Sequence, residues 1–311
     1  LQEGREKGRM TGGSSRTKEP QQGSYEDETN QCQGEISMTT STNEKNTDGK
    51  GSYAEVNGLK MYYEIHGTGK PLVLLPGGLM TIGMMGQILP DLAKTRQVIA
   101  VEVQAHGHTA DIDRPLTYEQ VADDTAALIQ HLGLERADVF GFSSGGGIAL
   151  QTAIRHPEVV RKLVVASSPC KSDGEYSEVR ALVTSFNPDA AMLSPMREAY
   201  VSTAPRPEDW PRLVAKIRQS AVVDCDWTQD VAAIQAPTLI VVGDADTVLP
   251  AHAVEMFGLL GGGKADAAMG NLSNAQLAVL PGTTHFTILA RSDLLLAMIT
   301  PFLDAPMPVA R

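Results

Sequence analysis

Cysteine is scarce in this chain of 311 residues: only Cys32, Cys170 and Cys225 occur, and they are far apart. They form neither a disulfide framework nor a CxxC metal knuckle. The pattern suits a reducing compartment, and we expect the protein to be cytoplasmic.

Long hydrophobic runs and positive charge are also lacking. No run of about 18 apolar residues occurs, so we expect no transmembrane helix. Lysine and arginine total 26 against 37 aspartates and glutamates, for a net charge of -11 and a pI near 5.1. Because nucleic acids and anionic membranes bind through basic patches that neutralise phosphates, we expect neither of them as a partner.

Large apolar residues are nearly absent from residues 1–50. Such a segment cannot bury enough surface to offset the entropy lost on ordering, so we predict a disordered N-terminal tail. It has no apolar stretch of the kind that a secretory signal peptide needs. We expect a start of translation at Met38, with read-through before it. A regulatory arm is the alternative role for these residues.

Beyond residue 50, short apolar runs alternate with helical patterns. Asn57-Gly58 predicts a hairpin, because both central positions of a type I′ turn need positive φ. Thr117 and Gln120 form the pattern of a capping box at a helix start. The alternation predicts an α/β fold with a mostly parallel sheet flanked by helices. The predicted strands are 53–56, 60–65, 72–75, 97–103, 137–140, 162–166, 238–242 and 276–280, and the main helices are 117–132, 144–156, 251–259 and 293–303.

Residues 171–235 break this alternation. They contain helical candidates and no clear buried strand, which predicts a helical cap inserted into a core of residues 51–170 and 236–311. An insertion at the carboxyl edge of the strands would cover the place where open α/β sheets bind ligands.

The segment Gly141-Phe142-Ser143-Ser144-Gly145 fits the pattern G-x-S-x-G between a predicted strand and a predicted helix. In this context the pattern indicates a nucleophile elbow, a sharp turn that exposes a serine at the start of a helix. The free N–H groups of that helix face developing negative charge. Ser143 is therefore the predicted nucleophile, and a glycine-rich turn without catalysis is the alternative. Ser144 does not fit, because a bulky residue stands two positions before it.

A serine hydroxyl needs a base, and the base needs an orienting acid. With this elbow the chain order is serine, acid, histidine. Of seven histidines, His285 alone fits, in a loop after the strand 276–280. The acid should follow the strand 238–242, where Asp244 and Asp246 compete. We favour Asp246, because Asp244 follows the strand directly and could brace the turn.

An oxyanion hole needs two N–H donors aimed at the developing charge. We expect one from the backbone of Ser144. The other should come from Gly78, or from Leu79, in the loop after the strand 72–75. Glycine there lets the backbone approach a substrate closely. A simple turn is the alternative interpretation.

These segments resemble the α/β-hydrolase superfamily. Leu74-Leu75-Pro76-Gly77-Gly78 looks like the oxyanion loop His-Gly-x of that family, with proline where histidine is common. Residues 102–109 look like its turn Asp-x-x-Gly-His-Gly-x-Ser. Three positions depart from the commoner residues: Glu102, Ala105 and Thr109. The turn is structural in the family, which implies that His106 and His108 support loops.

The resemblance covers residues 53–305 and implies a serine hydrolase that cleaves carboxylic esters by an acyl-enzyme mechanism, with no metal or organic cofactor. Carbon–carbon bond hydrolases, lactonases and cofactor-free perhydrolases share these motifs and stay open, as does a non-catalytic receptor for a small ligand. The expected partner is a small ester, and the expected state is a monomer or a homodimer. The residues expected to bind substrate are Leu79, Met80 and Phe142.

Overall fold

The computed structural model describes residues 49, 51–270 and 272–308. The tail predicted for residues 1–50 lies outside this part of the chain, apart from Gly49. Within the described ranges, no helix is long and apolar enough to cross a membrane.

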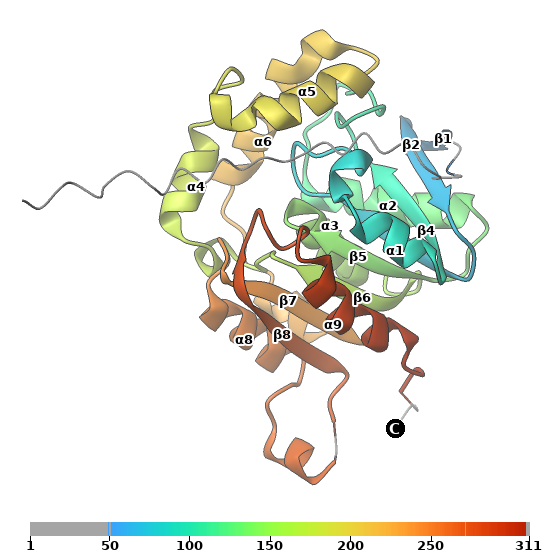
Figure 1. The fold of residues 1–311 in the computed structure, drawn as a ribbon, viewed down its shortest axis with the longest axis vertical. Helices are drawn as coiled ribbons and strands as arrows, with labels where there is room; N and C mark the ends of the chain where they lie inside the picture. The colour runs from blue at the N-terminus through green and yellow to red at the C-terminus, as the bar shows by residue number, and fades with distance from the viewer. Residues whose placement is uncertain (1–48, 50, 271, 309–311) are drawn as a thin grey trace, which may run out of the picture. The chain divides into compact units, whose positions relative to one another are not determined.

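An eight-stranded sheet in the order β1-β2-β4-β3-β5-β6-β7-β8 organises the described residues (Figure 1). The first two strands pair antiparallel to their neighbours, and every pair from β4 to β8 is parallel. The predicted mostly parallel sheet is confirmed. Its strands are β1 (Gly51–Val56), β2 (Leu59–His66), β3 (Lys70–Leu75), β4 (Arg96–Glu102), β5 (Ala137–Phe142), β6 (Val160–Ala166), β7 (Thr238–Ala245) and β8 (Ala275–Thr284).

The predicted hairpin joins β1 to β2. Asn57 and Gly58 have φ angles of 49° and 78°, so both central positions take the positive φ that a type I′ turn requires.

Helices cover both faces of the sheet, as predicted. Successive side chains of a strand point to opposite faces, so Val73 packs in one apolar cluster with Leu128 and Ile148, whereas Leu74 packs in another with Leu295. The core helices are α1 (Ile88–Ala93), α2 (Tyr118–His131), α3 (Ser144–Arg155), α8 (Pro250–Leu259) and α9 (Ser292–Asp304).

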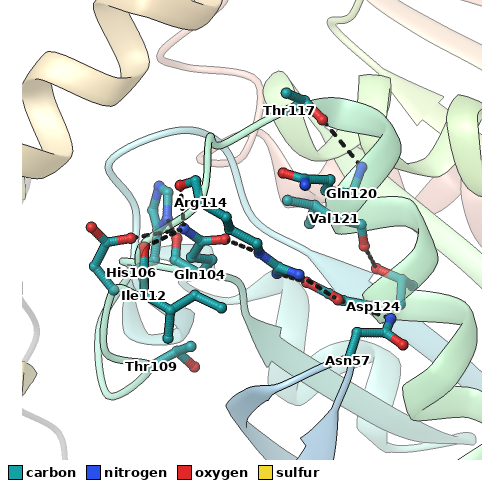
Figure 2. Close-up of polar contacts among 12 residues, drawn as sticks. Asn57, Gln104, His106, Thr109, Ile112, Arg114, Thr117, Gln120, Val121 and Asp124 are labelled. Atoms are coloured by element: carbon teal, nitrogen blue, oxygen red, sulfur yellow. Dashed lines mark hydrogen bonds and ion pairs between the residues drawn. The ribbon is translucent and has the colours of Figure 1, made fainter.

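Two local predictions need correction. Thr117 Oγ1 accepts a hydrogen bond from the Gln120 backbone N–H at 3.2 Å (Figure 2), but Gln120 Oε1 is buried with no partner among the described residues. The capping box is therefore only half formed. Residues 281–284, expected in a loop, belong to β8, because Thr284 still pairs with Ala245 beyond an irregularity in the ladder.

The chain between β6 and β7 folds into the predicted helices, and the cap's boundaries remain a prediction. These helices form a small apolar cluster centred on Trp210, Leu213 and Val214. The cluster also includes Leu79 and Ala105, which come from the chain before β5. The helices are α4 (Ser177–Thr184), α5 (Ser194–Thr203), α6 (Trp210–Val222) and α7 (Thr228–Ala232).

Ion pairs to the buried Asp111 also attach α6 to the segment after β4. Lys216 Nζ of α6 lies 2.6 Å from Asp111 Oδ1, and Arg212 Nε lies 2.6 Å from Asp111 Oδ2. Lys216 also donates to the backbone carbonyls of Ile112 and Arg114. Arg114 continues the network into the core, where it contacts Gln104 and Asp124 (Figure 2).

Candidate active site

Ser143 occupies the sharp turn between β5 and α3. Its φ of 55° and ψ of -125° are rare for a residue with a side chain and indicate local strain. Its N–H donates to the Ala166 carbonyl of β6 at 2.9 Å, which fixes the turn. A Cβ on Gly141 would meet the carbonyl of Gly145, and a Cβ on Gly145 would meet that of Leu75. Both glycines are therefore needed for the turn to fit.

The structure brings the three residues of the predicted triad together. Ser143 Oγ lies 2.9 Å from His285 Nε2, and His285 Nδ1 lies 2.9 Å from Asp246 Oδ1. Since a carboxylate only accepts, Nδ1 carries the proton and Nε2 is free to accept from the serine hydroxyl. This is the geometry that a histidine base needs toward a serine nucleophile.

Asp246 is fully enclosed and well supplied with donors. Its Oδ2 accepts from Ser167 Oγ at 2.5 Å and from the Gly243 N–H at 3.0 Å, and its Oδ1 accepts from the Thr247 N–H at 2.7 Å. Burial alone would raise the pKa of Asp246, but the hydrogen bonds from His285, Ser167 and the Gly243 N–H bring this pKa below its usual value. The carboxylate is therefore ionised at neutral pH.

Asp244, the competing aspartate, is exposed and points elsewhere. Its Oδ1 accepts from the Thr283 N–H at 3.1 Å. Hydrogen bonds from the Gly282 and Thr283 backbone lower the pKa of Asp244. It braces β7 against β8, in agreement with the sequence interpretation.

The backbone N–H groups of Ser144 and Gly78 are among those near Ser143 that make no hydrogen bond within the described part of the chain. The two residues lie next to each other, since a Cβ on Gly78 would stand 3.1 Å from Ser144 Oγ. The N–H of Leu79 donates to His106 Nε2 at 3.0 Å and is therefore already used. Gly78 is the better candidate of the two alternatives for the oxyanion hole.

His106 and His108 both hold loops. His106 is buried, its Nδ1–H donates to the Gln104 carbonyl at 2.9 Å (Figure 2), and burial lowers its pKa. His108 Nδ1 lies 2.8 Å from Glu102 Oε2, and the buried Glu102 also accepts from the Ile82 N–H at 3.1 Å. Neither histidine contacts Ser143, which agrees with the supporting role expected for them.

The three side chains expected to bind substrate differ in their distance from the triad. Phe142 is buried with its ring 5.1 Å from that of His285. Met80 is half-buried, and its sulfur approaches Gly77 beside Ser143. Leu79 packs into the apolar cluster of the cap. Their contact with substrate remains a prediction.

Three residues near the triad were not singled out from the sequence. Ser167 and Thr247 contact it directly, the latter with Oγ1 3.0 Å from His285 Nδ1. Glu175 is half-buried beside them; burial raises its pKa, while a hydrogen bond from Thr247 opposes that shift. The sequence does hold a signal for Ser167, because this serine directly follows the predicted strand 162–166 at the edge of the sheet where the triad residues lie.

Just before α4, the chain is hydrogen-bonded to residues 247–249, the segment after Asp246 that we call the acid loop. Glu175 forms an antiparallel bridge with Val248. The Tyr176 N–H donates to the Thr247 carbonyl at 3.1 Å, and the Leu249 N–H donates to the Gly174 carbonyl at 2.9 Å. We call residues 174–176 the cap strap.

No set of three or more histidine, cysteine, aspartate or glutamate side chains within the described ranges could hold a metal ion. The two cysteines of this part of the chain, Cys170 and Cys225, are free.

Comparisons with known proteins support this architecture. Residues 70–179 match the family model described as the alpha/beta hydrolase fold. The chain is 25% identical over 277 residues to a non-heme haloperoxidase of Rhodococcus erythropolis. This alignment covers 80% of this chain and 97% of that protein. It is 36% identical over 115 residues to a 2-hydroxymuconate semialdehyde hydrolase of Pseudomonas sp. (strain CF600), covering 36% of this chain and 41% of that protein.

Among solved structures, the enol-lactonase of Burkholderia xenovorans LB400 superposes with a TM-score of 0.65 at 20% identity, covering 82% of this chain and all of that chain (100%). The predicted fold class is confirmed.

Proposed function

We propose that this chain is an α/β-hydrolase of the serine hydrolase type and that it cleaves carboxylic esters of small molecules. One observation carries this proposal. Ser143, His285 and Asp246 form a continuous chain of hydrogen bonds, each 2.9 Å long, at a strained strand-to-helix turn. The relatives named above are consistent with a hydrolase and leave its substrate open.

The first step is attack by Ser143. His285 Nε2 takes the hydroxyl proton as Oγ bonds to the ester carbonyl carbon. Asp246 accepts from Nδ1–H throughout, which fixes the imidazole tautomer and stabilises the imidazolium that forms. Because Asp246 is ionised and enclosed, its charge is little screened by water.

The backbone N–H groups of Gly78 and Ser144 bind the oxyanion that this attack creates. A donor of this kind lowers the barrier by about 2.7–4 kcal/mol in known hydrolases. His285 then protonates the leaving alcohol. Water then attacks the acyl-enzyme carbonyl with His285 as base, and the acid leaves as Ser143 regains its proton.

A second candidate is hydrolysis of a carbon–carbon bond. The observation that favours it is the 36% identity over 115 residues to 2-hydroxymuconate semialdehyde hydrolase. The same triad and oxyanion donors would serve this reaction, so the two candidates differ in substrate and leaving group.

Hydrolysis of p-nitrophenyl esters from acetate to dodecanoate tests the first candidate, with Ser143→Ala as the control and labelling by a fluorophosphonate as an independent readout. Ester turnover that disappears in Ser143→Ala supports the esterase. Labelling of Ser143 without turnover of any ester contradicts the esterase and favours the carbon–carbon hydrolase. A folded protein that the probe does not label contradicts both, and favours a ligand receptor.

A further inference from the structure

Strand β6 separates the two ends of the triad. It lies between β5, which leads to Ser143, and β7, which leads to Asp246. The last residue of β6, Ala166, accepts a hydrogen bond from the Ser143 N–H at 2.9 Å. The residue after it, Ser167, contacts Asp246. Of these two consecutive residues, Ala166 therefore contacts the turn that carries the nucleophile, and Ser167 contacts the acid.

The burial and backbone conformation of Ser167 direct its hydroxyl at Asp246. It is 2% exposed, and its N–H donates to the Val241 carbonyl of β7 at 2.8 Å. Its φ of 53° lies in the left-handed region, which is uncommon for a residue other than glycine. This conformation turns the chain out of the sheet and places Oγ 2.5 Å from Asp246 Oδ2. Strained backbone of this kind persists where the surrounding contacts enforce it.

Because Ser167 donates to Oδ2, the two carboxylate oxygens of Asp246 have different partners. Oδ2 of Asp246 is held by Ser167 and by the Gly243 N–H, whereas Oδ1 faces His285 and Thr247. With Oδ2 held by two donors, the plane of the carboxylate is fixed and Oδ1 stays directed at the imidazole. Without Ser167, Oδ2 would keep only the Gly243 N–H, and the plane of the carboxylate would be held less firmly.

We propose that Ser167 is a positioning residue of the triad: it holds Asp246 at a set orientation and distance from the turn that carries Ser143. The inference rests on the proposed serine-hydrolase function. Ser167 itself is enclosed and touches no reacting atom, so it acts only through Asp246.

The test uses the full chain with Ser167→Ala and Ser167→Gly, because glycine tolerates the positive φ and removes the hydroxyl without added strain. Ser168→Ala is the matched control, since Ser168 is the neighbouring buried serine and makes no hydrogen bond to the triad within the described residues. We expect kcat and the rate of fluorophosphonate labelling to fall about tenfold in both Ser167 variants, the loss that one misdirected hydrogen bond of about 1.4 kcal/mol would cause. KM and the final extent of labelling should stay unchanged.

A double-mutant cycle separates positioning from a general structural effect. In an Asp246→Ala background, Ser167→Gly should cause no further loss of labelling rate. A loss that persists in this background, or unchanged kcat and labelling in folded Ser167→Gly, overturns the inference. If Ser143 is not labelled even in the unmodified protein, the proposed function fails instead, so the two failures are distinguishable.

Discussion

The backbone N–H of Leu79 donates a 3.0 Å hydrogen bond to the imidazole of His106, 27 residues further along the chain. Leu79 has a φ of 63°, so this bond holds a strained residue next to Gly78. The other imidazole nitrogen donates to Gln104. Because Nε2 must accept, the loop depends on a neutral His106, and the burial that lowers its pKa maintains that state.

His106→Ala should therefore lower kcat about 10- to 100-fold, a smaller loss than that for deleting an oxyanion donor outright. Leu79 would lose its acceptor, and the N–H of Gly78 would no longer be held toward the substrate. Ester hydrolysis at saturating substrate measures the effect. His131→Ala, on the exposed side of α2, is the control and should retain full activity. Equal activity of the two variants would contradict this role for His106.

Asp246→Asn should lower kcat by about 10⁴, as in other triads in which the acid becomes an amide and stabilises the wrong tautomer. Asp244→Asn should change kcat by less than about threefold, because Asp244 only accepts from the backbone of β8. Steady-state kinetics of both variants provide the comparison. The reverse order of the two losses would identify Asp244 as the acid.

Gly145→Ala should both destabilise the protein by about 1–3 kcal/mol and reduce activity. The added Cβ would press against the carbonyls of Leu75 and Pro76, and these are backbone atoms that cannot rotate away. Gly83→Ala serves as the control, since its Cβ would make only an ordinary contact. Urea unfolding with an activity assay checks the prediction, which fails if both variants unfold at the same midpoint.

The ion pair between Lys216 and Asp111 should make the stability of the protein depend on pH. Burial favours a raised pKa for Asp111, but Lys216, Gln104 and Arg212 outweigh it and lower that pKa. A carboxyl with a lowered folded pKa contributes stability above its unfolded pKa of about 3.9, and this contribution is lost as the pH falls through the folded value.

Lys216→Met keeps the side-chain stem and removes the charge. It should cost about 1–3 kcal/mol at pH 7, because the buried Asp111 loses one of its cationic partners. Urea unfolding at about pH 7 and about pH 3 should show a smaller difference between the two pH values in the variant than in the parent protein. An unchanged difference would show that Asp111 does not contribute to the acid sensitivity.

Local chain signals predict the sheet and most of the helices, but not α1 or α7. They also predict the three side chains that the structure brings together, Ser143, His285 and Asp246. The elbow at Ser143 and the hairpin at Asn57 depend on unusual backbone conformations, and the glycines next to them in the sequence indicate where these occur. Contacts between distant segments could not be read in this way. The N–H of Leu79 is used by His106, and the hydroxyl of Ser167 reaches Asp246 across 79 positions. No spacing rule encodes either contact, because both arise from the order of strands in the sheet.

The cap strap adds a mechanical link between two parts of the molecule. Residues 174–176 share backbone hydrogen bonds with the segment directly after Asp246. The segment that leads into α4 and the segment that carries the acid therefore form one hydrogen-bonded unit. A substitution that disrupts the strap should disturb the position of Asp246 as well.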